Sequence, residues 1–165
     1  VIMVASARSL LRCVPPADNR YWASTTFAVG EEIPFDEVPQ RLVGMGYTAA
    51  GAADARRNAE LNGLTRNAWF MADDATDYIL DAAENGERID VLSIDPPRAG
   101  STPEFLEAAC TLKPRRIVYI SCNPVTQERD LNQLLDGGYR LTRLTPVDMF
   151  PHTDHVETVA VLERK

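Results

Sequence analysis

Three places in the second half of the sequence combine residue types that can act as nucleophiles, acids or bases. At the first, Cys122 follows an apolar run and precedes a helical pattern, within the stretch Ser121–Pro124. A thiol at such a position gains exposure and the dipole of the coming helix, and both favour the reactive thiolate. The alternative interpretation is that Cys122 is a small buried side chain, as free cysteines often are.

The second place is the turn Asp95–Arg98, in which two prolines separate a carboxylate from a guanidinium. Prolines restrict the backbone, so they fix the directions in which the carboxylate and the following side chain point. Amino-group methyltransferases often carry a similar turn with an aromatic residue at the position of Arg98, and this difference speaks against their chemistry. The alternative is an ordinary turn at the end of a strand.

The third place is the segment Phe150–Thr158, which holds both histidines of the chain. His152, His155 and Glu157 lie close together, but their spacing matches none of the usual zinc signatures, and Pro151 disfavours a helix. We therefore predict no metal here. We expect instead a loop that presents polar side chains at the mouth of a site.

The elements that must position these residues follow from the apolar patterns. These predict strands at 41–45, 68–71, 89–94, 116–121, 139–147 and 156–163, and helices at 48–61, 74–84, from 102 onward, and at 125–135. Alternation of strands and helices predicts an α/β fold with a parallel sheet, and the short link between the last two strands predicts an antiparallel hairpin. Gly46, Asp95 and Cys122 each follow directly on a predicted strand. Ligands of such sheets bind beyond the carboxyl ends of the strands, so we expect these residues to line one crevice.

Composition limits the classes of function. The 165 residues suit one domain, and the net charge of −7 makes the chain a poor general binder of nucleic-acid phosphates. The longest stretch without a charge, Leu42–Ala53, is too short to span a bilayer. The three cysteines are far apart and odd in number, which is typical of a cytoplasmic protein without disulfides. Residues 1–40 do not fit the alternating pattern.

Together, these motifs resemble the RNA uracil-5 methyltransferase family, which forms 5-methyluridine in ribosomal and transfer RNA. The resemblance rests on four stretches, which are Ala55–Gly63, Ser93–Gly100, Tyr119–Leu131 and Pro146–Val159. It covers about residues 41–165 and is closer to the ribosomal than to the transfer RNA branch. It implies a Rossmann-like class I methyltransferase fold, mostly parallel with a C-terminal antiparallel hairpin and incomplete at its N-terminus. Residues 1–40 would then be an atypical segment, and 41–165 the C-terminal part of the catalytic domain.

The resemblance also implies roles for single residues. The nucleophile of the family falls on Cys122 and its general base on Glu157. The implied cofactor is S-adenosyl-L-methionine, without a metal or an iron–sulfur cluster, and the implied partner is RNA, with no membrane. The residues expected at the cofactor are Asp95, Asp74 and Gly46, and those expected at the RNA are Arg98, Asn123 and His152. For Asp74, a helix-capping role is an equal alternative.

The sequence also departs from the family. The family has a Gly-rich loop after its first sheet strand, but Gly30 is the only glycine before Gly44. Gly46 stands where the family has a glutamate that binds the ribose of the cofactor, and an N-terminal RNA-binding region has no counterpart here. We therefore expect part of a longer gene product whose activity by itself is in question. Two alternatives remain, a non-catalytic Rossmann-like remnant and an amino-group methyltransferase.

Overall fold

The computed structural model describes residues 2–6, 41–46, 48–66, 68–149 and 151–165. Apart from the short strand at its start, the atypical segment 1–40 therefore lies outside the described residues. The described elements, in chain order, are β1 Ile2–Ser6, β2 Arg41–Gly46, α2 Ala49–Leu61, β3 Ala68–Ala72, α3 Ala75–Glu84, β4 Val91–Ile94, α4 Pro103–Leu112, β5 Arg116–Ser121, α5 Pro124–Asp136, β6 Tyr139–Val147 and β7 Glu157–Arg164.

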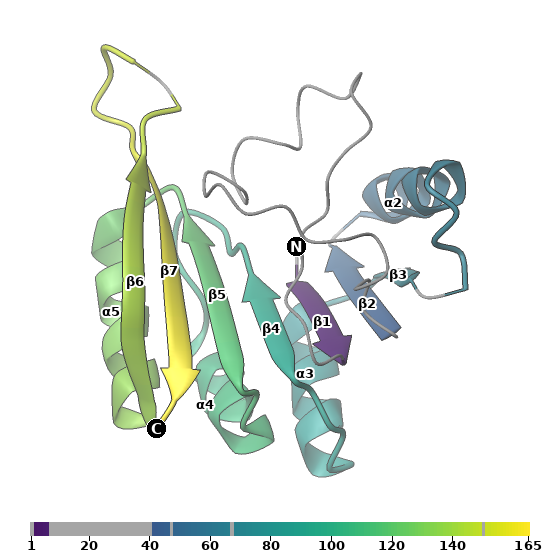
Figure 1. The fold of residues 1–165 in the computed structure, drawn as a ribbon, viewed down its shortest axis with the longest axis horizontal. Coiled ribbons are helices and arrows are strands. Elements are labelled where there is room, and N and C mark those ends of the chain that lie inside the picture. Colours follow the sequence, from purple (N-terminus) through teal and green to yellow (C-terminus); the bar gives the residue numbers. More distant parts are fainter. Residues whose placement is uncertain (1, 7–40, 47, 67, 150) are drawn as a thin grey trace.

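One sheet contains all of these strands, in the order β3-β2-β1-β4-β5-β7-β6 (Figure 1). The pairs β2–β3 and β4–β5 are parallel, and β7 lies antiparallel between β5 and β6. The predicted mostly parallel sheet with a C-terminal antiparallel pair is therefore confirmed. The boundaries differ by one or two residues; β4, for example, begins at Val91 although the apolar pattern begins at Ile89.

The strand β1 was not predicted. It fills the centre of the sheet and runs antiparallel to both neighbours, with Ile2 level with Met45 of β2 and with Ile94 of β4. Its start therefore lies at the edge of the sheet where β2 and β4 end. β1 itself ends at the opposite edge, because it runs antiparallel to β2 and β4.

Local signals in the sequence account for the helix starts. Thr48 caps α2 by accepting a hydrogen bond from the amide of Gly51, and Thr102 caps α4 by accepting one from Phe105. Pro103 and Pro124 stand at the first position of their helices, where an N–H would have no partner within the helix. These start signals matter because α4 and α5 begin close to the predicted site residues.

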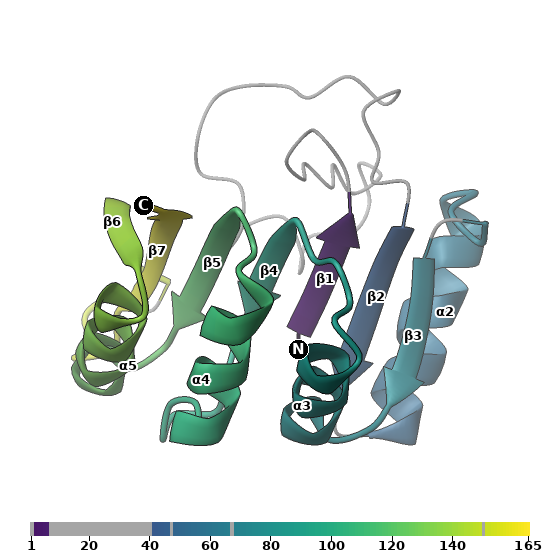
Figure 2. The ribbon, with the colours of Figure 1, turned by 90° about the horizontal axis from the view of Figure 1, so that it is seen from below.

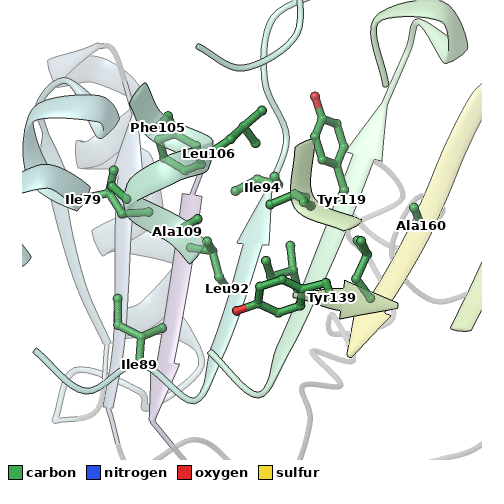
Figure 3. Packing of buried hydrophobic residues seen from close by; sticks show 14 of the residues in the cluster. Ile79, Ile89, Leu92, Ile94, Phe105, Leu106, Ala109, Tyr119, Tyr139 and Ala160 are labelled. Atoms are coloured by element: carbon green, nitrogen blue, oxygen red, sulfur yellow. The ribbon is translucent and has the colours of Figure 1, made fainter. Parts of the chain in front are cut away.

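The core lies between the sheet and α3, α4 and α5, which stand side by side along one face (Figure 2). Figure 3 shows how Ile79 of α3 and Leu106 of α4 meet Leu92 and Tyr119 of the sheet. Connections between parallel strands of one sheet are right-handed. The connection through α2 runs from β2 to the edge strand β3, whereas the connection through α3 runs in the opposite direction, from β3 towards β4. The two helices therefore lie on opposite faces of the sheet. No helix among the described residues is long and apolar enough to cross a membrane.

Candidate active site at the carboxyl edge of the sheet

Most of the predicted site residues meet at one edge of the sheet, here called the carboxyl edge, where β2, β3, β4 and β5 end. Gly46 is the last residue of β2 and is level with the end of β3, while Asp95 directly follows β4. Cys122 directly follows β5. Parallel strands end at the same edge, which is why residues far apart in sequence come together there.

The pairing of β5 with β7 brings the candidate nucleophile and base together. Ser121 pairs with Thr158, and the same register continued by one residue sets Cys122 level with Glu157. Both residues are partly buried. The sequence motifs are 35 residues apart (157 − 122), so it is the antiparallel return of β7 beside β5 that makes them neighbours.

Buried hydrogen bonds fix the backbone on both sides of this pair. The amide of Gln127, in α5, donates to the carbonyl oxygens of Tyr119 (3.1 Å) and Thr158 (3.4 Å). The Thr158 hydroxyl lies 2.6 Å from Gln127 Oε1 and 3.3 Å from the Ser121 carbonyl oxygen. Since Ser121 precedes Cys122 and Thr158 follows Glu157, this bridge holds the two strand ends together. Sequence reasoning missed it, because the spacing of the two side chains gives no signal of contact.

The turn around Cys122 is held by its neighbours. The Ser121 hydroxyl lies 3.0 Å from the Asn123 amide nitrogen and 3.1 Å from the Asn123 carbonyl oxygen. The Asn123 side chain caps α5 by accepting a hydrogen bond from Val125 and also donates to the Arg98 carbonyl oxygen. Asn123, predicted to contact substrate, therefore has a structural role in positioning the chain beside Cys122.

Arg98 and the histidine segment also approach each other. Arg98 Nη1 lies 3.4 Å from His155 Nδ1, which connects the turn after β4 with the loop between β6 and β7. His152, the histidine predicted to contact RNA, lies in the same exposed loop with a positive φ of 68°. Sequence reasoning chose His152 and missed His155, which the structure places beside Arg98.

The surroundings at the carboxyl edge raise the pKa values of two carboxyl groups, those of Glu157 and Asp95. Partial desolvation raises the pKa of Glu157, the charge of Asp95 raises this pKa further, and the guanidinium of Arg98 lowers it. Desolvation also raises the pKa of the Asp95 carboxyl. A carboxylate whose pKa is raised binds protons more readily, which suits a group that must accept one.

The described residues supply only part of a site for S-adenosylmethionine. Gly46 has no side chain with which to bind ribose hydroxyls, and the Asp74 carboxylate already accepts a hydrogen bond from Thr76 as the cap of α3. The start of β1 lies where a parallel strand would lead into a loop around the cofactor. Asp95, which directly follows β4, also places a carboxylate at this edge. These residues therefore do not form a complete cofactor site.

No group of three or more His, Cys, Asp or Glu side chains suited to a metal occurs in the described part of the chain. The carboxyl edge brings together a thiol, a carboxylate of raised pKa and a guanidinium. A thiolate can add to an electron-poor carbon, and a neighbouring carboxylate can take the proton that must leave afterwards.

Comparison with known proteins relates the C-terminal half of this chain to a family. Residues 84–165 match the family described as tRNA (uracil-5-)-methyltransferase. This part of the chain belongs to the RNA uracil-5 methyltransferase family. The match contains Asp95, Arg98, Cys122 and Glu157, so it covers the candidate nucleophile and base.

Curated relatives of this chain are described as RNA methyltransferases. The chain is 49% identical over 121 residues to an uncharacterized RNA methyltransferase of Lactobacillus johnsonii, a match that covers 73% of this chain and 27% of that protein. It is 46% identical over 125 residues to one of Bacteroides thetaiotaomicron, with 75% and 27% covered. The chain thus spans about a quarter of the length of these relatives.

Solved structures show the same fold. The tRNA (uracil-54, C5)-methyltransferase of Pyrococcus abyssi, in complex with S-adenosyl-L-homocysteine, matches with a TM-score of 0.60 and 37% identity over 73% of this chain and 28% of that one. TrmN from Thermus thermophilus matches with a TM-score of 0.53 and 20% identity over 74% and 36%, a likeness of fold alone.

Proposed function

We propose that this chain carries the nucleophile and the base of an S-adenosylmethionine-dependent enzyme that methylates C5 of uracil in RNA. Cys122 is the nucleophile and Glu157 the base. The observation that carries the proposal is the β5–β7 register, which sets the two residues level at the carboxyl edge of a family-matching region. Asp95 and Arg98 are the charged groups that act on the Glu157 carboxyl.

The proposed chemistry overcomes the weak nucleophilicity of uracil C5. The Cys122 thiolate forms a bond to C6, and the π electrons of the C5–C6 bond move toward the C4 carbonyl to give an enolate, whose C5 can accept a methyl group. Glu157 then takes the C5 proton. The electron pair of the C5–H bond restores the C5–C6 double bond, and the thiolate leaves. The methyl donor takes part through a site that the described residues do not complete, so these steps concern the chain's own groups alone.

The proposed substrate is a uracil in RNA, ribosomal rather than transfer RNA, in the cytoplasm. The net charge of −7 is unfavourable for holding an RNA backbone. We therefore place general RNA binding in another part of the whole protein and assign base chemistry to this chain. His152, in the exposed loop between β6 and β7, and Arg98, in the turn after β4, are the proposed contacts to the RNA.

Trapping with RNA that contains 5-fluorouracil tests the nucleophile. Fluorine at C5 cannot leave as a proton, so the covalent adduct through Cys122 persists after denaturation. The chain is incubated with this RNA and S-adenosylmethionine at millimolar concentration, and the products are separated on denaturing gels. We expect a protein–RNA band that Cys122→Ala abolishes and that the matched control Cys110→Ala leaves in place.

A chain that gives no such band, or a band that survives Cys122→Ala, contradicts the proposal. The first result would favour the alternative of a non-catalytic Rossmann-like remnant, which the reversed direction of β1 at the centre of the sheet supports. An amino-group methyltransferase is disfavoured by Arg98, which stands where such enzymes carry an aromatic side chain.

A further inference from the structure

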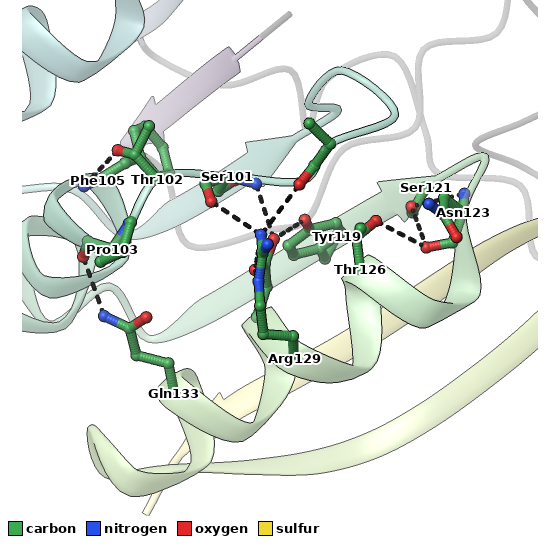
Figure 4. Close-up of polar contacts among 12 residues, drawn as sticks. Ser101, Thr102, Pro103, Phe105, Tyr119, Ser121, Asn123, Thr126, Arg129 and Gln133 are labelled. Carbon is green, nitrogen blue, oxygen red and sulfur yellow. Dashed lines mark hydrogen bonds and ion pairs between the residues drawn. The ribbon is translucent and has the colours of Figure 1, made fainter.

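The turn after β4 is joined to α5 by an unusual number of side-chain contacts. This turn, residues 95–102, is here called the Arg98 loop. Polar side chains at the cap and at successive turns of α5 bond to the backbone of this loop and to Pro103 just beyond it. Figure 4 shows the contacts of Arg129 with the loop and of Gln133 with Pro103. Residues three or four positions apart share one face of a helix, so these side chains form a single polar row. The members of this row are Asn123, Thr126, Arg129, Asp130 and Gln133.

Side chains of this row donate hydrogen bonds to successive backbone carbonyl oxygens of the Arg98 loop. The Asn123 amide and the Thr126 hydroxyl donate to the Arg98 carbonyl oxygen at 3.0 and 3.2 Å. Arg129 Nη2 lies 3.1 Å from the carbonyl oxygen of Ala99 and 3.2 Å from that of Ser101. The main chain is thereby fixed on both sides of the point where the Arg98 side chain leaves it.

Asp130 connects the Arg98 loop and α5 to the sheet. Its carboxylate is 1% exposed and accepts hydrogen bonds from the Ser101 amide (2.7 Å) and the Tyr119 hydroxyl (2.5 Å). Arg129 Nε donates to the same carboxylate at 2.8 Å. A buried charge is tolerated when it is paired and hydrogen-bonded, and here all three partners also connect the loop, α5 and β5.

Gly100 allows the close approach. Its φ of +85° is unfavourable for residues with a side chain, and a Cβ at this position would lie 2.5 Å from Arg129 Nη2 and 2.6 Å from Asp130 Oδ2. The loop can therefore reach the row of α5 in this conformation only because it has glycine there.

We infer that Arg129 and Asp130 are positioning residues, which hold the Arg98 guanidinium in place relative to Glu157 and Cys122. The helix that carries them begins at Pro124, two residues after Cys122, so the same helix adjoins both the nucleophile and the Arg98 loop. The meaning of this geometry for catalysis rests on the proposed function, but the geometry itself can be tested without substrate.

The test measures the pKa of Glu157 by NMR titration of its carboxyl carbon in the intact chain. Arg98 lowers this pKa, whereas desolvation and the charge of Asp95 raise it. Arg98→Met should therefore raise the pKa of Glu157 and gives the reference shift. Arg129→Met, which leaves Arg98 in the sequence, should raise it by most of the same amount, because Arg98 loses its fixed place.

Three further variants separate positioning from other causes. Gly100→Ala changes no charge and disturbs the contacts with α5 from the loop side, so it should raise the pKa of Glu157 as well. The double variant Arg98→Met/Arg129→Met should show no larger shift than Arg98→Met alone, since Arg129 acts through Arg98. Asn132→Ala, on the exposed side of α5, is the matched control and should leave the pKa unchanged.

An unchanged pKa of Glu157 in both Arg129→Met and Gly100→Ala, with a shift in Arg98→Met, overturns the inference. Additive shifts in the double variant also overturn it, because they would show that Arg129 acts on Glu157 directly. If Gly100→Ala does not fold, Arg129→Lys, which keeps the charge but cannot reach both carbonyls, takes its place with the same expected direction. None of these results depends on whether Cys122 forms an adduct with RNA, so failure here and failure of the proposed function are distinguishable.

Discussion

The two described cysteines carry the same thiol in different surroundings. Burial, with a contribution from the charge of Glu107, raises the pKa of Cys110, which packs against the core from α4. Cys122 lies at the carboxyl edge, one residue before the cap of α5.

Brief treatment with iodoacetamide should therefore label Cys122 faster than Cys110. The measurement is mass mapping of the labelled peptides over time, with labelling of the denatured chain as the control for intrinsic reactivity. Equal labelling of the two thiols, or faster labelling of Cys110, would count against Cys122 as the nucleophile.

Glu157 offers a second test at the scale of a residue, in a complete and active parent enzyme. Addition and methyl transfer do not need this carboxylate, but loss of the C5 proton does. Glu157→Gln should slow that step by about 10²- to 10⁴-fold and leave methylated RNA bound through Cys122. Denaturing gels with labelled RNA detect this adduct, and Cys122→Ser should give neither adduct nor product. Normal turnover of Glu157→Gln without a protein–RNA band would show that the base lies elsewhere.

The same carboxyl sets an expected pH dependence for the parent. The base must be ionised, and the pKa of Glu157 is raised above its ordinary value of 4.5 by desolvation and by Asp95. The rate of product release should therefore fall as the pH decreases, with a midpoint above 4.5. Arg98→Met, which removes the group that lowers this pKa, should move the midpoint to higher pH.

At the scale of the element, the hydrogen bond from Tyr119 of β5 to Asp130 of α5 makes the free energy of unfolding depend on pH in the alkaline range. Desolvation and the bond to Asp130 raise the pKa of Tyr119 above its ordinary value of 10.0, and burial also raises that of Tyr139. The folded state therefore keeps protons that the unfolded chain releases above pH 10.0, so the free energy of unfolding should fall as the pH rises beyond that value.

Denaturant titrations at increasing pH measure this decline. Tyr119→Phe should flatten it, and at neutral pH the variant should lose about 1–3 kcal/mol because the buried Asp130 carboxylate loses a donor. Tyr139→Phe, whose hydroxyl donates to the Pro114 carbonyl oxygen, should flatten the decline with a smaller neutral loss of about 0.5–1.5 kcal/mol. If the free energy of unfolding falls equally steeply with pH in the unchanged chain and in both variants, Tyr119 and Tyr139 are not the groups responsible for the decline.

Elements with strong local signals could be predicted from the sequence, and contacts between distant side chains could not. Thr48 and Thr102 mark helix starts because a short hydroxyl side chain satisfies free amides, and the structure places both as caps. Asp95 and Cys122 could be placed at the same edge because each follows a strand and the two strands are parallel neighbours. The bond between Ser101 and Asp130 joins residues 29 apart and has no periodic signature. The strand Ile2–Ser6 was missed because a segment of five residues carries no signal for its pairing partners or for the direction in which it pairs.

At the scale of the whole molecule, the incomplete cofactor site limits binding. Gly46 leaves the ribose hydroxyls without the charge-assisted partner of the family, a loss of about 1.5–3 kcal/mol. That corresponds to a roughly 10- to 150-fold weaker affinity before the missing Gly-rich loop is counted. We expect calorimetry to show weak or undetectable binding of S-adenosylmethionine by this chain. A micromolar or tighter dissociation constant would contradict this expectation.

The reversed central strand has a consequence for the order in which the sheet assembles. β2–β3, β4–β5 and β6–β7 pair residues that are 26 positions apart or fewer, and β5 pairs with β7 across 37 (158 − 121) to 47 (163 − 116) positions. β1 pairs with β2 at a similar separation, with 43 (45 − 2) positions between Ile2 and Met45, but Ile2 must also find Ile94, which is 92 (94 − 2) positions away. Closing such long loops is entropically costly and slow, so β1 should join last and leave first. Amide hydrogens of β1 and of the β2 and β4 edges facing it should then exchange faster than those between β5 and β7, and the sheet should come apart along its middle rather than from its rims.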